Sequence, residues 1–131
     1  MRVLIMTKYS QRPVFLNLLR IHMPVTALTS IAHRLAGLLL ALLIPAMLYL
    51  LDLSLRGQAG FDQVIQWLRL DQVRLLLLIP IWALSHHLLA GLRYLLIDIG
   101  IGIKLDTARH SARLVSVGAL LLTVLVYGML L

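Results

Sequence analysis

Three stretches without a charged residue constrain this chain more than any other feature. They are 17 or 18 residues long and almost wholly apolar: Leu35–Leu51, Leu75–Leu92 and Leu114–Leu131. Each can be extended by a turn at its polar end, which brings it close to the roughly 20 residues that a helix needs to cross about 30 Å of hydrocarbon. We therefore predict an all-α membrane protein with three transmembrane helices, over about residues 29–51, 74–97 and 112–131.

The composition excludes most other classes of protein. Of the 131 residues, 61% are hydrophobic and 13% are charged, whereas soluble domains have about half and about a quarter. The net charge of +7 would be compatible with nucleic-acid binding, but the basic residues separate apolar runs and form no continuous stripe. We expect membrane lipid around the chain and no nucleic-acid partner. The first stretch lies too far into the chain for a cleaved signal peptide.

The distribution of charge predicts an orientation in the membrane. The segment through Arg34 has five Lys or Arg and no acid, the loop 52–74 balances three basic residues with three aspartates, and the loop 93–113 has four basic residues and two aspartates. Lys and Arg are enriched in cytoplasmic loops. We therefore expect the segment 1–28 and the second loop to be cytoplasmic, with the first loop and the C-terminus outside.

The first loop contains the pattern of a short helix lying in the membrane interface. Gly57, Gly60 and Asp62 are typical of a turn followed by a helix cap. The residues that follow would give this helix an apolar side: Phe61, Ile65, Trp67 and Leu68. Trp67, and Trp82 in the second span, are also of the kind found in aromatic belts.

A first polar cluster lies where the first span begins. Ser30 and Arg34 are four residues apart, so they share one helix face, and Gly37 continues it. A hydroxyl and a guanidinium on one face can donate hydrogen bonds to a carbonyl or an anion. The alternative is a capped helix start with an arginine that extends to the lipid headgroups.

A second cluster lies inside the second span, where polar residues usually have a function. His87, Gly91, Tyr94 and Asp98 share one helix face, while His86 points about 100° away. A small residue one turn from an imidazole leaves room for a flat group such as a porphyrin. The alternative is a histidine bonded to a neighbouring helix and a glycine that allows close packing.

Redox chemistry would need a cofactor or other subunits. The chain has no cysteine and no glutamate, which excludes a cysteine-held iron–sulfur cluster within it. If His87 ligates a haem, the second axial ligand comes from His33, which the register places nearer the surface, or from another subunit. Three helices enclose a cofactor poorly, which favours the second option.

Taken in order, these motifs resemble one family. Arg12-Pro13, then Ser30-Ile31-Ala32-His33-Arg34, then His87-xxx-Gly91-x-Arg93-xxxx-Asp98 are similar to the cytochrome b subunit of succinate dehydrogenase, the larger membrane anchor of respiratory complex II. The resemblance covers nearly the whole chain, residues 1–131, as a single anchor domain. It implies a location in the bacterial inner (cytoplasmic) membrane. The expected partners are a small membrane anchor, an iron–sulfur subunit and a flavoprotein subunit.

The resemblance also implies roles for individual residues. His87 matches the axial haem b ligand, with the second ligand on the small anchor, and Gly91 lies in the same motif. Ser30 and Arg34 match positions that line the ubiquinone site, and His33 and Arg34 lie where haem propionates are bound. Relatives often carry histidine where this chain has Tyr94. We further expect Arg93 to be an interfacial anchor and Asp98 to pair with it or with another basic residue.

The expected function is that of an anchor subunit in the electron-transport step of the tricarboxylic acid cycle, outside the catalytic centre. Succinate would be oxidised at a flavin in another subunit, with ubiquinone as the electron acceptor. An anchor of a quinol:fumarate reductase is the first alternative. A haem-free small transporter or assembly protein is less favoured, because the spans contain no carboxylate.

Overall fold

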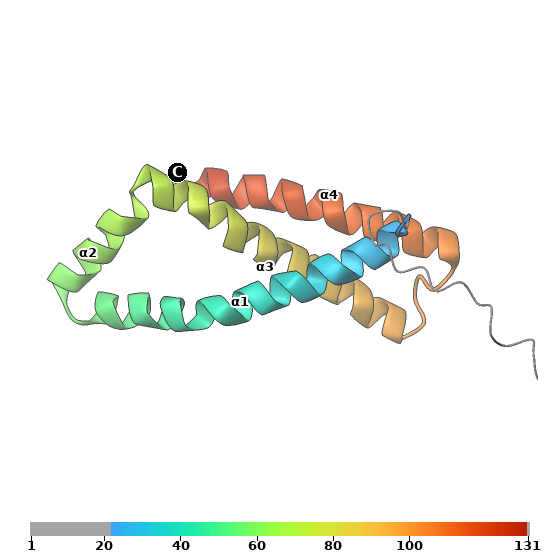
Figure 1. The fold of residues 1–131 in the computed structure, drawn as a ribbon, viewed down its shortest axis with the longest axis horizontal. Helices are drawn as coiled ribbons and strands as arrows, with labels where there is room; N and C mark the ends of the chain where they lie inside the picture. Colours follow the sequence, from blue (N-terminus) through green and yellow to red (C-terminus); the bar gives the residue numbers. More distant parts are fainter. Residues whose placement is uncertain (1–21, 131) are drawn as a thin grey trace, which may run out of the picture.

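A computed structural model describes residues 22–130 of the chain. This range folds into four helices and contains no strand: α1 (Val25–Leu55), α2 (Gln58–Leu68), α3 (Asp71–Asp98) and α4 (Leu105–Leu130) (Figure 1). The helices α1, α3 and α4 are long and apolar enough to cross a membrane. The prediction of an all-α protein with three such helices is confirmed. The orientation stays a prediction, and most of the segment 1–28 lies outside the described residues.

The long helices extend past the limits predicted for the spans. Helix α1 has 31 residues, which at 1.5 Å per residue is about 46 Å. Helix α4 begins at Leu105, seven residues before the predicted span, because Arg109 and Arg113 continue the helix and do not belong to a loop. The second loop is therefore limited to 99–104. Gly100 and Gly102 turn the chain there, with φ of 82° and 81°, a conformation that favours glycine.

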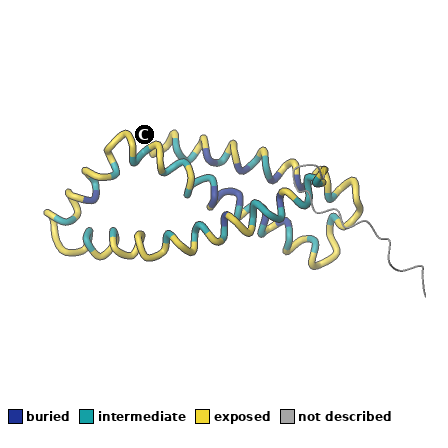
Figure 2. The backbone as a smooth tube through the Cα atoms, viewed as in Figure 1, coloured by how far each residue is buried: buried dark blue, intermediate teal, exposed yellow. Residues whose placement is uncertain are grey.

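Helix α3 is the central element of the bundle and contacts both α1 and α4 (Figure 1). Small residues line these contacts, as is usual between transmembrane helices. Within residues 22–130, five of the seven buried hydrophobic residues are alanines: Ala36, Ala83, Ala90, Ala112 and Ala119. Buried positions gather where α3 meets its neighbours, while most of the surface of the long helices is exposed (Figure 2). The leucines on this outer surface are therefore available to the lipid of a membrane.

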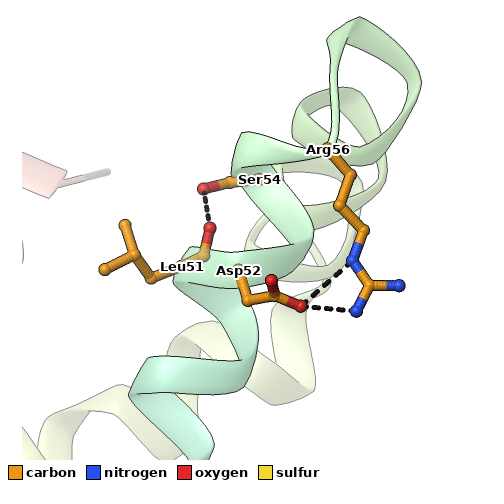
Figure 3. A network of polar contacts seen from close by, with 4 residues as sticks. All are labelled: Leu51, Asp52, Ser54 and Arg56. Carbon is orange, nitrogen blue, oxygen red and sulfur yellow. Dashed lines mark hydrogen bonds and ion pairs between the residues drawn. The ribbon is translucent and has the colours of Figure 1, made fainter.

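A short polar network closes the end of α1. The Arg56 guanidinium donates through Nε to Asp52 Oδ2 at 3.0 Å, and the Ser54 hydroxyl donates to the Leu51 carbonyl at 2.7 Å (Figure 3). Both partners of the ion pair are largely exposed. Gly57 follows with φ of 116°, and the chain turns there into α2.

The short helix predicted in the first loop is present, but its start and its inner face differ from the prediction. Helix α2 begins at Gln58, directly after Gly57. Asp62 lies inside the helix and is not its cap, because its carboxylate accepts a hydrogen bond from Gln58 Nε2 at 2.9 Å. Val64 is the buried residue of α2, whereas Phe61 is half exposed. The position of α2 in the membrane interface stays a prediction.

Candidate functional site

The crossing of α1 and α3 brings His33 and His87 into direct contact. Their rings stack with centroids 4.2 Å apart and planes inclined by 8°. The register placed His33 nearer the surface than His87, and the depth of the two residues in the membrane stays a prediction; the stacking brings their rings into contact. The contact joins residues 54 positions apart, so helix periodicity alone could not reveal it.

Each histidine faces a glycine on the opposite helix. A Cβ atom at Gly37 would lie 2.9 Å from His87 Cε1 and 3.2 Å from its Nδ1, while one at Gly91 would lie 3.6 Å from His33 Nε2. In each helix the glycine follows the histidine by four residues, so two His-xxx-Gly turns pack against one another. Gly91, predicted to make room for a cofactor, lies against the His33 ring. Gly37 gives the closer approach and was not predicted to contact His87.

A hydrogen bond sets the tautomer of His87. Its Nδ1 lies 3.3 Å from the carbonyl oxygen of His33. A carbonyl oxygen only accepts, so Nδ1 carries a proton, and in the neutral imidazole Nε2 then keeps its lone pair. This is the arrangement that orients imidazole ligands of metals, in which one nitrogen donates to a carbonyl and the other faces the ion. The chemistry of His87 therefore fits a haem ligand.

The stacked pair does not fit both axial positions of one haem. The two axial ligands of a haem lie on opposite faces of the porphyrin. Rings in contact at 4.2 Å leave no space for that group between them.

Ser30 and Arg34 lie on one face of α1, as their spacing predicts. Arg34 Nε lies 3.4 Å from the Ser30 carbonyl oxygen. The Arg34 side chain is exposed, and Ser30 is half-buried. Ser30 and Arg34 lie within one helical turn of His33 along α1, so a hydroxyl and a guanidinium flank this histidine in the sequence. Such a pair can donate hydrogen bonds to a carboxylate or to a quinone carbonyl.

Tyr94 and Arg93 complete the surroundings of the histidines. The Tyr94 ring meets His33 edge-on, with centroids 5.3 Å apart. Its hydroxyl is buried and has no hydrogen-bond partner within residues 22–130. The Arg93 guanidinium lies 5.4 Å from the centre of the Tyr94 ring, an arrangement that attracts a cation to the aromatic face.

Arg93 is a buried link between helices and not the interfacial anchor that was predicted. Its Nε donates to Ser111 Oγ at 2.9 Å and its Nη2 to the Ala108 carbonyl at 3.1 Å, so it joins α3 to α4. It makes no ion pair with Asp98, which is exposed and unpaired within the described range. Two neutral acceptors bond this guanidinium, which reduces the cost of burying its charge.

His86 has a structural environment that the sequence did not indicate. It is 2% exposed, its Nε2 lies 3.5 Å from the Thr29 carbonyl oxygen, and its ring stacks on Trp82 with centroids 5.4 Å apart. Trp82 is therefore partly buried against α3's own His86, and its place in an aromatic belt stays a prediction. The sequence did contain one sign of this stacking: Trp82 and His86 are four residues apart and therefore share one face of the helix.

Comparison with known proteins connects this geometry to a family. The profile described as succinate dehydrogenase/fumarate reductase transmembrane subunit matches residues 8–126. The chain belongs to this family. It is therefore a membrane-anchor subunit that crosses the membrane several times, as the three apolar helices independently indicate. Membership of the family leaves no support for the transporter alternative.

Two bacterial members of the family are similar over most of their length. The succinate dehydrogenase cytochrome b556 subunit of Coxiella burnetii is 35% identical over 117 residues, which cover 88% of this chain and 94% of the relative. The subunit of the same name from Paracoccus denitrificans is 33% identical over 118 residues, covering 87% and 88%. The resemblance inferred from the histidine and arginine motifs is confirmed at the level of the family.

Proposed function

We propose that this chain is the haem b-binding anchor subunit of a succinate:ubiquinone oxidoreductase in the bacterial inner (cytoplasmic) membrane. It would hold the flavoprotein and iron–sulfur subunits at the cytoplasmic face and share the haem with a small second anchor. The names of the two relatives support haem b and succinate as the substrate of the complex. Because both are succinate dehydrogenases, succinate oxidation is favoured over the quinol:fumarate reductase alternative.

The hydrogen bond from His87 Nδ1 to the His33 carbonyl carries this proposal. It leaves Nε2 free to bind iron and fixes the ring against α1. When bound, haem supplies one-electron redox chemistry. This chain's part is to orient the ligand through Gly37 and Gly91, which allow the two helices to approach. His33 and Arg34 would bind the propionate carboxylates, because a guanidinium fork suits a carboxylate.

Ser30 and Arg34 would form this subunit's share of the ubiquinone-reduction site. Both lie on one face of α1, and the Arg34 side chain is exposed. The hydroxyl and the guanidinium donate hydrogen bonds to quinone oxygens, and the positive charge stabilises negative charge that develops on them during reduction. The redox centres that deliver electrons would lie in the partner subunits.

The ligand assignment is tested by replacing His87. In the purified complex, His87→Gln should abolish or strongly reduce the haem b signal in the reduced-minus-oxidised spectrum. His110→Gln is the matched control, because His110 is exposed on α4 and bonds only the Asp106 carbonyl of its own helix. An unchanged haem signal in His87→Gln would refute the assignment.

The quinone site is tested by separating two activities of the complex. Arg34→Leu should lower ubiquinone reduction by at least about tenfold, the effect of losing roughly 1.4 kcal/mol of transition-state stabilisation, while succinate oxidation with an artificial acceptor stays intact. Arg113→Leu, which removes an exposed arginine of α4, should change neither activity. Normal ubiquinone turnover in Arg34→Leu would show that this arginine has no role in the site.

A further inference from the structure

A second polar feature lies at the other end of the bundle from the histidine pair. There the end of α2, the start of α3 and the end of α4 come together (Figure 1). They enclose a hollow of about 390 Å³ with two arginines in its wall. The lining residues are Ile65, Leu68, Arg69, Arg74, Leu77, Tyr127 and Leu130.

The two guanidinium groups of this hollow have no acidic partner within the described part of the chain. The one ion pair in residues 22–130 joins Arg56 to Asp52. Asp71 lies between Arg69 and Arg74 in the sequence, yet neither arginine comes within 4.0 Å of its carboxylate. Arg69 is exposed and Arg74 is half-buried. Two cations thus share one wall without a local counter-charge.

The rest of the hollow is mostly apolar. Leucine and isoleucine side chains form most of its lining, and Tyr127 adds one hydroxyl group. The hollow lies where α3 begins and α4 ends, so we expect it near the lipid headgroups, because both helices are long enough to cross the hydrocarbon. A ligand that suits it has an anionic head for the arginines and an apolar part for the leucines.

We propose that this hollow binds one anionic phospholipid. Its phosphate would lie between Arg69 and Arg74, because arginine forks bind phosphate through paired hydrogen bonds. Its acyl chains would pass along Leu68 and Leu77 into the bilayer. The inference is independent of the proposed haem and quinone roles, since none of those residues lines this hollow. Free inorganic phosphate offers the same anionic chemistry and is distinguished by the test.

The experiment measures lipid binding by the complete complex. Wild type, Arg69→Gln/Arg74→Gln and Arg56→Gln are purified in mild detergent, stripped of lipid by washing, and titrated with phosphatidylglycerol or phosphatidylcholine in native mass spectrometry. Arg56→Gln is the control, because it removes an arginine from the same end of the bundle that is already paired. The wild-type complex should bind phosphatidylglycerol more tightly than phosphatidylcholine. The double variant should bind it about 25-fold more weakly, at about fivefold for each arginine.

Each outcome decides the proposal. Weaker phosphatidylglycerol binding in the double variant alone, with an unchanged elution volume of the complex, supports it. Equal affinity in all three proteins overturns it, as does equal binding of the two lipids by wild type. Complete competition by millimolar inorganic phosphate would show a free-anion site without lipid specificity. A double variant that fails to assemble is replaced by Arg69→Lys/Arg74→Lys. That variant keeps the charge without the fork, and unchanged affinity in it also contradicts binding through paired hydrogen bonds.

Discussion

Substitution of Gly37 by alanine should disturb the His87 imidazole from the opposite helix. The new methyl carbon would lie 2.9 Å from His87 Cε1, whereas carbon atoms in contact are about 3.5–4.0 Å apart. The ring or the helices must therefore separate by about 0.6 Å or more. Forcing a methyl group into a packed contact costs about 1–3 kcal/mol, so the complex should become less stable to heat.

The displacement should also weaken the bond that orients the imidazole. His87 Nδ1 is already 3.3 Å from the His33 carbonyl, so a shift of this size away from α1 takes it beyond hydrogen-bonding range. A bonded Nδ1–H makes imidazole a more basic ligand, which favours oxidised iron. Loss of about 1 kcal/mol corresponds to about 40 mV for one electron. If His87 ligates haem b, as proposed, the midpoint potential of the haem should therefore rise by about 40 mV.

The assay is a redox titration of the haem b absorbance in the purified complex, together with thermal unfolding. Gly128→Ala is the control, because a Cβ atom there meets nothing within 4 Å. Wild-type stability and an unshifted potential in Gly37→Ala would refute the reasoning that this glycine holds the imidazole in place. Lower stability with an unshifted potential would limit Gly37 to helix packing.

Three further predictions concern the stability of the complex, each measured as the thermal unfolding midpoint. Ser111→Ala removes the acceptor of Arg93 Nε and should destabilise the complex by about 1.5–3 kcal/mol. Ser116→Ala is the control, because the Ser116 hydroxyl bonds only its own helix, and it should destabilise the complex clearly less. Equal effects of the two substitutions would contradict a link between α3 and α4 through Ser111. Ala90→Leu places a large side chain at a fully buried position of α3 and should lower the stability of the complex by about 1–3 kcal/mol. An unchanged unfolding midpoint would show that the helices are not closely packed at Ala90. Asp52→Asn breaks an exposed ion pair and should change stability by no more than about 0.5 kcal/mol, so a larger loss would show that the pair matters.

The helices could be predicted from the sequence because the bilayer restricts the backbone so strongly. A charge-free apolar run in lipid must satisfy its own amide and carbonyl groups, and a helix does so. The residues at which the helices begin and end were harder to predict from the sequence. Residues such as Arg109 are hydrophilic but also good helix formers, so α4 continues through a segment expected to be a loop. The start of α2 was displaced because Gly57 alone makes the turn.

The candidate site could be predicted only as far as one helix determines it. The spacing of Ser30 and Arg34, and of His87 and Gly91, follows from 3.6 residues per turn. The stacking of His33 on His87 depends on where α1 crosses α3, which no local pattern encodes. The same is true of Arg93, whose charge suggested the membrane surface while Ser111 and Ala108 on another helix provide a buried place for it.

The alanine contacts between the helices have a consequence for how much of this subunit a cell can keep. In lipid, burial of apolar area gives the helices little driving force to associate, and the bundle depends on the close packing of these small residues. Binding of partners then supplies much of the stability by mass action. Copies made in excess of the other subunits would remain open to proteolysis. The cellular amount of this subunit should therefore follow the supply of its partners more closely than its own rate of synthesis.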